Sequence, residues 1–259
     1  MVADRWTRAV RAQLGLGRLL PLGGPADGAW IAESAAAGAL RRAGGAAVPG
    51  LRLGRLRLAL DDPVTAARPA VPVPPSGLPP GPLRVTAEFA ATAGEPLPAV
   101  AERLRSALWS AAERELGLVV GAVDLRVTAL LEEVTSEPEE PEEPGEAAGA
   151  ADTPEAAEAG RGADQGGRRP APSDTASRAA LGVPGVARLD PVLGAPPPSP
   201  PGDIRHVQIQ IAVTAGHRPL DVARAVRAAV TAAEQGPVTV SVLVTAVIPP
   251  RRGTARTPG

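Results

Sequence analysis

Hydrophobic residues change their spacing twice within one stretch of this chain. Over residues 84–91 apolar and polar residues alternate, which is typical of a strand with one buried face. Helical spacing replaces the alternation over 97–116, and the alternation returns over 123–131. The stretch therefore predicts a β-α-β unit.

A second stretch repeats the first in the same order. The tripeptide Thr-Ala-Gly that follows the first strand at 92–94 recurs at 214–216. Alternating strands are predicted at 207–213 and 238–248, and a helical apolar stripe lies between them. Such self-similarity indicates a duplicated module.

The first copy also contains an earlier half. A short strand is predicted at 28–32, a helix at 33–47 and a strand at 51–60, whose inward-facing parity shifts at Gly54 and so indicates a bulge. The full order is β-α-β-β-α-β. This order predicts an α+β fold of two layers, a mixed sheet of about four strands with two helices on one face.

The second copy is shorter than the first. It keeps the Val-Pro-Gly turn of residues 48–50 at 183–185 and a remnant of the first helix near 174–182, and its intact β-α-β part covers 204–249. So few residues bury a marginal core. We expect the second copy to dock on the first or on another chain.

The remaining segments are predicted to be linkers. The complete domain, 28–132, carries an insertion at 61–82 that contains eight prolines. Residues 133–203 are rich in acidic residues, Pro and Gly, with eleven carboxylates and no Arg between Glu132 and Glu158, and such a composition predicts disorder. The tail 250–259 is predicted to be disordered as well.

Composition argues against most enzyme chemistry. The chain has no Cys and no Lys, two His, three Trp, one Phe and no Tyr, so it lacks thiolates, Schiff-base and P-loop lysines, and aromatic platforms for bases. Neither histidine has a ligand-type partner at a useful spacing, and both are expected at the surface. We predict no catalytic residue, no cofactor, no metal and no small-molecule substrate.

The N-terminal region, 1–27, is predicted to be an amphipathic helix and a loop. Arg5, Trp6, Arg8 and Arg11 place positive charge and an interfacial aromatic on such a helix. The helix can lie on an anionic membrane surface or contact a partner, or it can pack on the domain as a cap. The sequence lacks a signal-peptide pattern and an apolar span, so we expect a cytoplasmic protein, with contact at the inner membrane face as an alternative.

Residues 28–131 resemble the alkaline-shock or general-stress family of envelope stress response proteins. The resemblance rests on the segments GAWIAES, VPG, LRVTAEFAATAGEPLPAVAERLRSAL and VDLRVTAL, which occur in the family's order. The positions that match the family's structural motif are Gly50, Gly94, Leu97, Pro98 and Val100. The Pro-rich insertion at 61–82 departs from the family, in which the second and third strands are joined closely.

The resemblance implies a non-enzymatic scaffold in an envelope stress response, which self-associates or binds a membrane-associated protein. Exposed strand edges provide the physical means for such binding. Two alternatives stay open. One is a nucleic-acid-binding α+β module, which the scarcity of aromatics and the net charge of −1 disfavour. The other is an intramolecular pseudo-dimer with a regulatory role.

Overall fold

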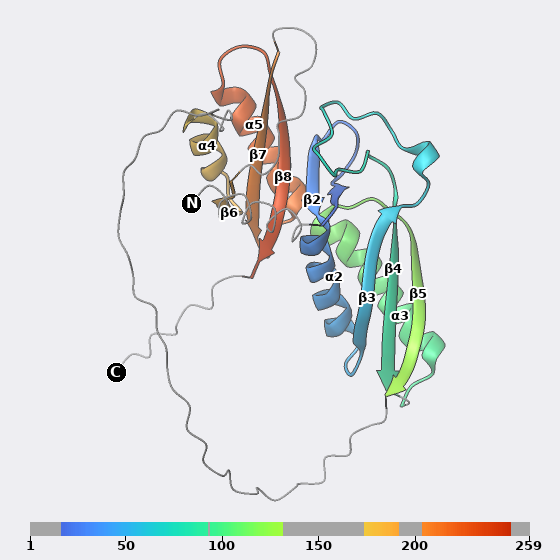
Figure 1. Cartoon of the computed structure of the whole chain (residues 1–259). Coiled ribbons are helices and arrows are strands. Elements are labelled where there is room, and N and C mark those ends of the chain that lie inside the picture. Colours follow the sequence, from blue (N-terminus) through green and yellow to red (C-terminus); the bar gives the residue numbers. More distant parts are fainter. Residues whose placement is uncertain (1–16, 93, 132–173, 192–203, 250–259) are drawn as a thin grey trace, which may run out of the picture.

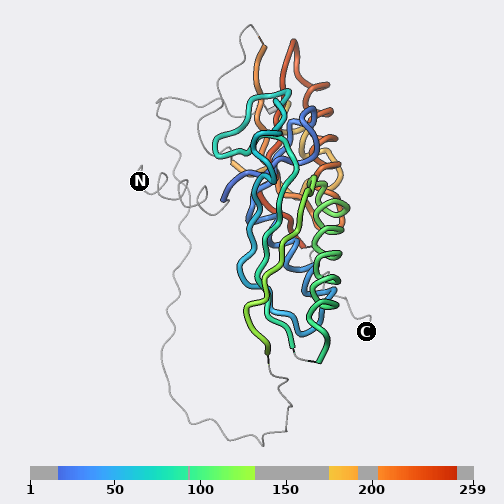
Figure 2. Tube along the Cα trace, turned by 90° about the vertical axis from the view of Figure 1, so that its right-hand side faces the viewer, coloured from blue at the N-terminus to red at the C-terminus, as the bar shows by residue number. Residues whose placement is uncertain are grey.

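A computed structural model describes residues 17–92, 94–131, 174–191 and 204–249 of the chain. They form a mixed α+β structure with two sheets, a three-stranded sheet of order β3-β4-β5 and a five-stranded sheet of order β1-β2-β8-β7-β6. The sheets lie side by side, and the helices gather on one side of them (Figures 1 and 2). The structure thus has two layers.

The three-stranded sheet contains the second half of the predicted first copy. Its strands are β3 (Arg52–Leu60), β4 (Leu83–Thr92) and β5 (Val120–Leu131), with β3 antiparallel and β5 parallel to β4. Helix α2 (Glu33–Ala47) precedes β3, and α3 (Leu97–Ser110) continues into the π-helical turn η2 (Ala111–Leu116). The β3–β4 register shifts between Leu53 and Leu56, which confirms the bulge predicted at Gly54.

The five-stranded sheet contains the predicted second copy. Helix α4 (Asp174–Leu181) leads into β6 (Val186–Leu189), and α5 (Pro219–Ala233) connects the parallel strands β7 (Arg205–Thr214) and β8 (Val238–Ile248). Apolar residues of α5 such as Val226 and Val230 are buried against the sheet. Strand β6 is antiparallel to β7, so the directions of β6, β7 and β8 match those of β3, β4 and β5.

The closing strands of both sheets share one local irregularity. The β4–β5 register shifts after Phe89, and Thr128 Oγ1 donates a hydrogen bond to the Phe89 carbonyl at 3.1 Å. The β7–β8 register shifts after Ile211, and Thr245 Oγ1 donates to the Ile211 carbonyl at 3.0 Å. Each threonine satisfies a carbonyl beside the register shift.

The first strand of the first copy lies in the other sheet. Strand β2 (Ala29–Ala32) pairs in parallel with β8, with Ile31 opposite Val244, and β1 (Leu19–Pro21) pairs antiparallel with β2 on its other side. The four-stranded sheet predicted for the first copy is therefore wrong, since that sheet has three strands. The physical reason is that β2 is apolar on both faces and is buried on both beside β8, with Ile31 in the main core and Trp30 in the cluster with Val71 and Leu243.

The Pro-rich insertion 61–82 packs against the five-stranded sheet. It begins with the 3₁₀ turn η1 (Pro63–Thr65), and its Val71 belongs to a small apolar cluster with Trp30 and Leu243. Trp30 is 1 % exposed, and its indole Nε1 donates to the Leu78 carbonyl at 3.0 Å. The insertion thus covers β2 and fixes it in the sheet.

Two short strands lie where the sequence predicts other structure. Strand β1 falls in the N-terminal region 1–27, which is predicted to be an amphipathic helix and a loop, and β6 falls in the predicted linker 133–203. Three or four residues are too few to display a period, and both strands depend on pairing with a neighbour. The helix remnant predicted near 174–182 is confirmed as α4. The acidic stretch, the tail 250–259 and the N-terminal residues 1–16 lie outside the described residues.

One continuous core joins the two sheets. It includes Leu40, Phe89 and Leu104 from the first part of the chain, together with Val226 and Val242 from the second, all buried. No Tyr and a single Phe occur in the sequence, so the core consists largely of Val, Leu, Ile and Ala. This shared core supplies the apolar cover that the second copy was expected to need.

Candidate protein-interaction site

The outer edges of the two sheets differ in how well they are covered. In the five-stranded sheet, the β1 edge is covered by the insertion: Leu19 N donates to the Ser76 carbonyl at 3.1 Å, and Leu78 N donates to the Leu19 carbonyl at 2.8 Å. The opposite edge strand, β6, has four residues. Covered and very short edges are two ways in which proteins avoid unwanted strand pairing.

Two side chains cap the backbone of one residue, Leu58, on the nine-residue edge of β3. Glu33, which is 7 % exposed, accepts a hydrogen bond from Leu58 N at 3.3 Å, and Arg18 Nη2 donates to the Leu58 carbonyl at 2.8 Å. Arg18 Nε also lies 3.4 Å from Glu33 Oε2, and this ion pair orients both side chains toward Leu58. Both backbone groups of Leu58 are thereby satisfied.

The β5 edge has no such cover among the described residues. Strand β5 lies at the outer side of the three-stranded sheet, away from the five-stranded one (Figure 1). It has twelve residues, and Val127 and Leu130 are 40 % and 58 % exposed. Arg105 Nε of α3 approaches the Val123 carbonyl at 3.4 Å, which is long for a hydrogen bond. A long edge with exposed apolar residues is suited to pairing with another strand.

The two faces of β5 differ in chemistry. On the helix-free face, Asp124 lies opposite Thr86 and pairs with Arg84 at 2.6 Å, and Arg126 lies opposite Glu88 without an ion pair in the described part of the chain. On the helix-covered face, Leu125 packs against the core, while Val127 is partly exposed. We call residues 123–127 the β5 edge segment.

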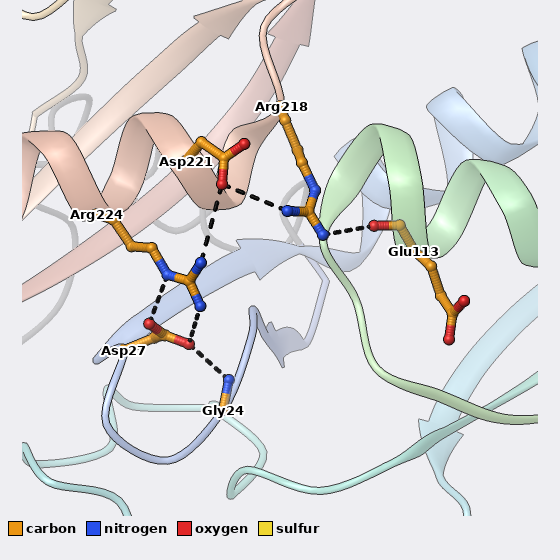
Figure 3. Close-up of polar contacts among 6 residues, drawn as sticks. All are labelled: Gly24, Asp27, Glu113, Arg218, Asp221 and Arg224. Atoms are coloured by element: carbon orange, nitrogen blue, oxygen red, sulfur yellow. Dashed lines mark hydrogen bonds and ion pairs between the residues drawn. The ribbon is translucent and has the colours of Figure 1, made fainter.

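Polar contacts between the two parts of the molecule hold the β2 strand beside α5 (Figure 3). Arg224 of α5 donates from Nε and Nη2 to the two Asp27 carboxylate oxygens at 2.7 and 3.0 Å. Gly24 N donates to Asp27 Oδ2 at 2.7 Å. At the start of α5, Arg218 Nη2 donates to the Glu113 carbonyl of η2 at 2.8 Å.

An apolar contact lies next to these polar contacts. Leu220 of α5 is buried against Gly23 and Gly117, two glycines with φ of +79° and +90°. A Cβ atom added at Gly117 would lie 2.4 Å from the Leu220 Cβ. The backbone groups also meet, since Gly23 N donates to the Gly117 carbonyl at 3.0 Å. The close fit requires glycine at 117.

Asp27 makes this contact sensitive to acid. Burial alone would raise the pKa of Asp27, but hydrogen bonds from Arg224 and Gly24, with the charges of Arg224 and Arg227, hold it below the ordinary value of 3.8. A lowered carboxyl pKa stabilises the fold above pH 3.8, and this contribution is lost as the pH falls through the folded pKa.

We expect Asp27→Asn to lower the free energy of unfolding by about 1 kcal/mol at neutral pH, because the partly exposed ion pair is lost while the Gly24 contact is kept. Urea denaturation of both proteins at neutral pH and near pH 3 measures the difference. It should shrink at the lower pH, because the Asp27 carboxyl of the unfolded chain takes up a proton there before that of the folded chain, whose pKa is lowered. A difference that stays constant with pH would contradict the assigned role of the charge.

His206 is the residue most similar to a catalytic group in the described part of the chain. Its Nε2 lies 3.0 Å from Ser241 Oγ and its Nδ1 lies 2.8 Å from Thr239 Oγ1, and burial lowers the pKa of its imidazole. A hydroxyl, instead of a carboxylate, faces the second ring nitrogen, and Ser241 is buried. We interpret the arrangement as hydrogen bonds that satisfy a half-buried sheet face. Of the two histidines predicted at the surface, His217 is exposed and His206 is half-buried on this sheet face.

The structure places the motif positions just after the end of α2 and around the start of α3. Gly50, with φ of +75°, forms the turn before β3, and Gly94 is exposed after β4. Leu97 and Pro98 begin α3, and Val100 is buried in the core. These residues shape turns and packing, and they do not meet at one site. Arg5, Trp6, Arg8 and Arg11 lie outside the described residues.

Comparisons with protein-family models, with curated proteins and with solved structures find no match to this chain. Within the described residues, no helix combines the length and apolar character that crossing a membrane requires. No three metal-ligand side chains cluster in the same part of the chain. The β5 edge segment is therefore argued from its own geometry.

Proposed function

We propose that the chain is a tandem duplication that forms an intramolecular pseudo-dimer, in which the first strand of one copy closes the sheet of the other. The matching strand directions and the paired Thr128 and Thr245 hydrogen bonds support this proposal. The strand that would complete the first copy's own sheet is β2, which pairs with β8. Because β2 pairs with β8, the edge of β5 lacks the strand neighbour that β8 has.

We propose that the protein is a non-enzymatic interaction or scaffold protein that recruits a partner's strand at β5. The twelve-residue edge of β5 is the observation that carries the proposal, because among the described residues β1 is covered by the insertion, β6 has four residues and β3 is shorter and capped at Leu58. The resemblance to envelope stress response proteins agrees with a scaffold that self-associates or binds a membrane-associated protein. A cytoplasmic location with contact at the membrane's inner face is part of the same proposal.

We expect a charged edge variant to lose its partners. Val127→Lys with Leu130→Lys places two solvated cations on β5, which disfavours strand addition. Full-length wild type and the double variant are each immobilised and then incubated with a cell extract. The proteins that each of them retains are quantified by mass spectrometry. Proteins that dock at β5 should fall at least about tenfold in the variant.

The matched control is Val64→Lys, since Val64 is 91 % exposed and belongs to the insertion and not to β5. It should retain the wild-type set of proteins. Identical sets on wild type and the β5 variant, together with equal sedimentation of the two proteins, would overturn the proposed function. Circular dichroism of each variant shows that the fold is preserved.

A further inference from the structure

The β5 edge segment is self-complementary. We propose that β5 pairs antiparallel with β5 of a second copy of this chain, which makes one six-stranded sheet across a two-fold axis at Leu125. The proposal rests on the proposed function of the β5 edge and names its partner. It is carried by the order of charged and apolar residues in the segment and by the position of β5, which in the described part of the chain has no strand paired to its outer side.

Antiparallel pairing about Leu125 brings complementary residues together. Residues directly opposite in an antiparallel pair project from the same face of the sheet. Asp124 of each copy therefore faces Arg126 of the other copy, which gives two such contacts in the dimer. On the helix-covered face, Val123 faces Val127 and Leu125 faces its own counterpart. Val127, 40 % exposed in the single chain, then gains apolar cover, and Arg126 gains a carboxylate partner.

Other registers are disfavoured by the same residues. A two-fold axis at Asp124 sets two carboxylates directly opposite each other, and an axis at Arg126 does the same with two guanidinium groups. A slip by one residue places each charged side chain opposite an apolar one and inverts the faces of the two sheets. The register with Leu125 on the axis therefore has the best charge pairing.

Exchange of β2 between copies cannot fill this edge. Each chain has one β2 strand and two closing strands, β5 and β8, that offer an edge for it. If β2 of one copy joined β5 of another, it would leave β8 of its own chain open. Pairing of β5 with β5 covers the open edge in both copies and keeps every existing strand pair. A closed symmetric dimer is the outcome.

The test is charge complementation in the full-length chain. Sedimentation velocity over a concentration series should show a wild-type dimer. Asp124→Arg or Arg126→Glu alone puts like charges opposite each other and should weaken dimerisation at least about tenfold. An equimolar mixture of the two variants should restore it, because the arginine introduced at position 124 then faces the glutamate introduced at position 126 of the other copy.

The control is Arg57→Glu, an exposed charge reversal on β3, which should leave the dimer unchanged. A wild type that sediments as a monomer throughout, single variants that dimerise like wild type, or a mixture that stays monomeric would each overturn the proposal. If the wild type is monomeric while the lysine variant of β5 still loses proteins from the extract, the proposed function stands and the second copy is not the partner.

Discussion

Replacing Trp30 with Ala should lower the free energy of unfolding by about 3 to 5 kcal/mol, the range for removing a large buried aromatic. Trp30 lies in the middle of the β1–β2–insertion contact, fully buried and bonded through Nε1 to Leu78. Its loss leaves a cavity against Val71 and an unsatisfied Leu78 carbonyl. Urea denaturation followed by far-UV circular dichroism measures the change.

Hydrogen exchange shows where the Trp30→Ala effect is located. The backbone bonds from Leu19 and Leu78 should lose protection first, because the insertion is held on β2 by the indole. Val64→Ala in the same insertion is the control and should stay within about 0.5 kcal/mol of wild type, since the side chain is exposed. If the two variants unfold at the same urea concentration, the insertion does not depend on Trp30.

Replacing Gly117 with Ala should cost about 2 to 5 kcal/mol, the sum of an unfavourable left-handed conformation and an overpacked contact. The added Cβ would lie 2.4 Å from the Leu220 Cβ, so either α5 or the turn after η2 must move. The contact between the two halves should loosen as a result. Urea denaturation measures the loss, and exchange at α5 amides reports the movement.

Gly236→Ala separates the two contributions. Gly236 has φ of +87°, close to the +90° of Gly117, but an added Cβ there meets nothing within 4 Å. The control should cost about 1 to 2 kcal/mol from conformation alone. Equal losses at 117 and 236 would show that the Leu220 contact adds nothing to stability.

Most helices and long strands could be predicted from residue spacing. The helix expected at 33–47 is α2, and the alternating stretch expected at 238–248 is β8, because both are long enough to display their period. Alternation also indicated the buried face of the first half of β4, whereas the middle of β8 is buried on both faces. The bulge at Gly54 followed from a change of parity within one strand.

The partner of each strand could not be predicted in the same way. All four residues of β2 are apolar and buried, so their spacing carries no information on whether the neighbour of this strand is β5 or β8. The contact of His206 with Thr239 and Ser241 depends on the β7–β8 register, which arises only when the strands pair. The β5 edge was for this reason not identifiable as open from the sequence alone.

The pairing of β2 with β8 ties the order of folding to the order of synthesis. Ala29 is made long before its neighbour Val242. During translation, Trp30 and Ile31 therefore stay without their final sheet until β8 has left the ribosome. The nascent chain thus exposes an apolar strand while the residues between β2 and β8 are made, and a chaperone that binds short hydrophobic segments is suited to protect it.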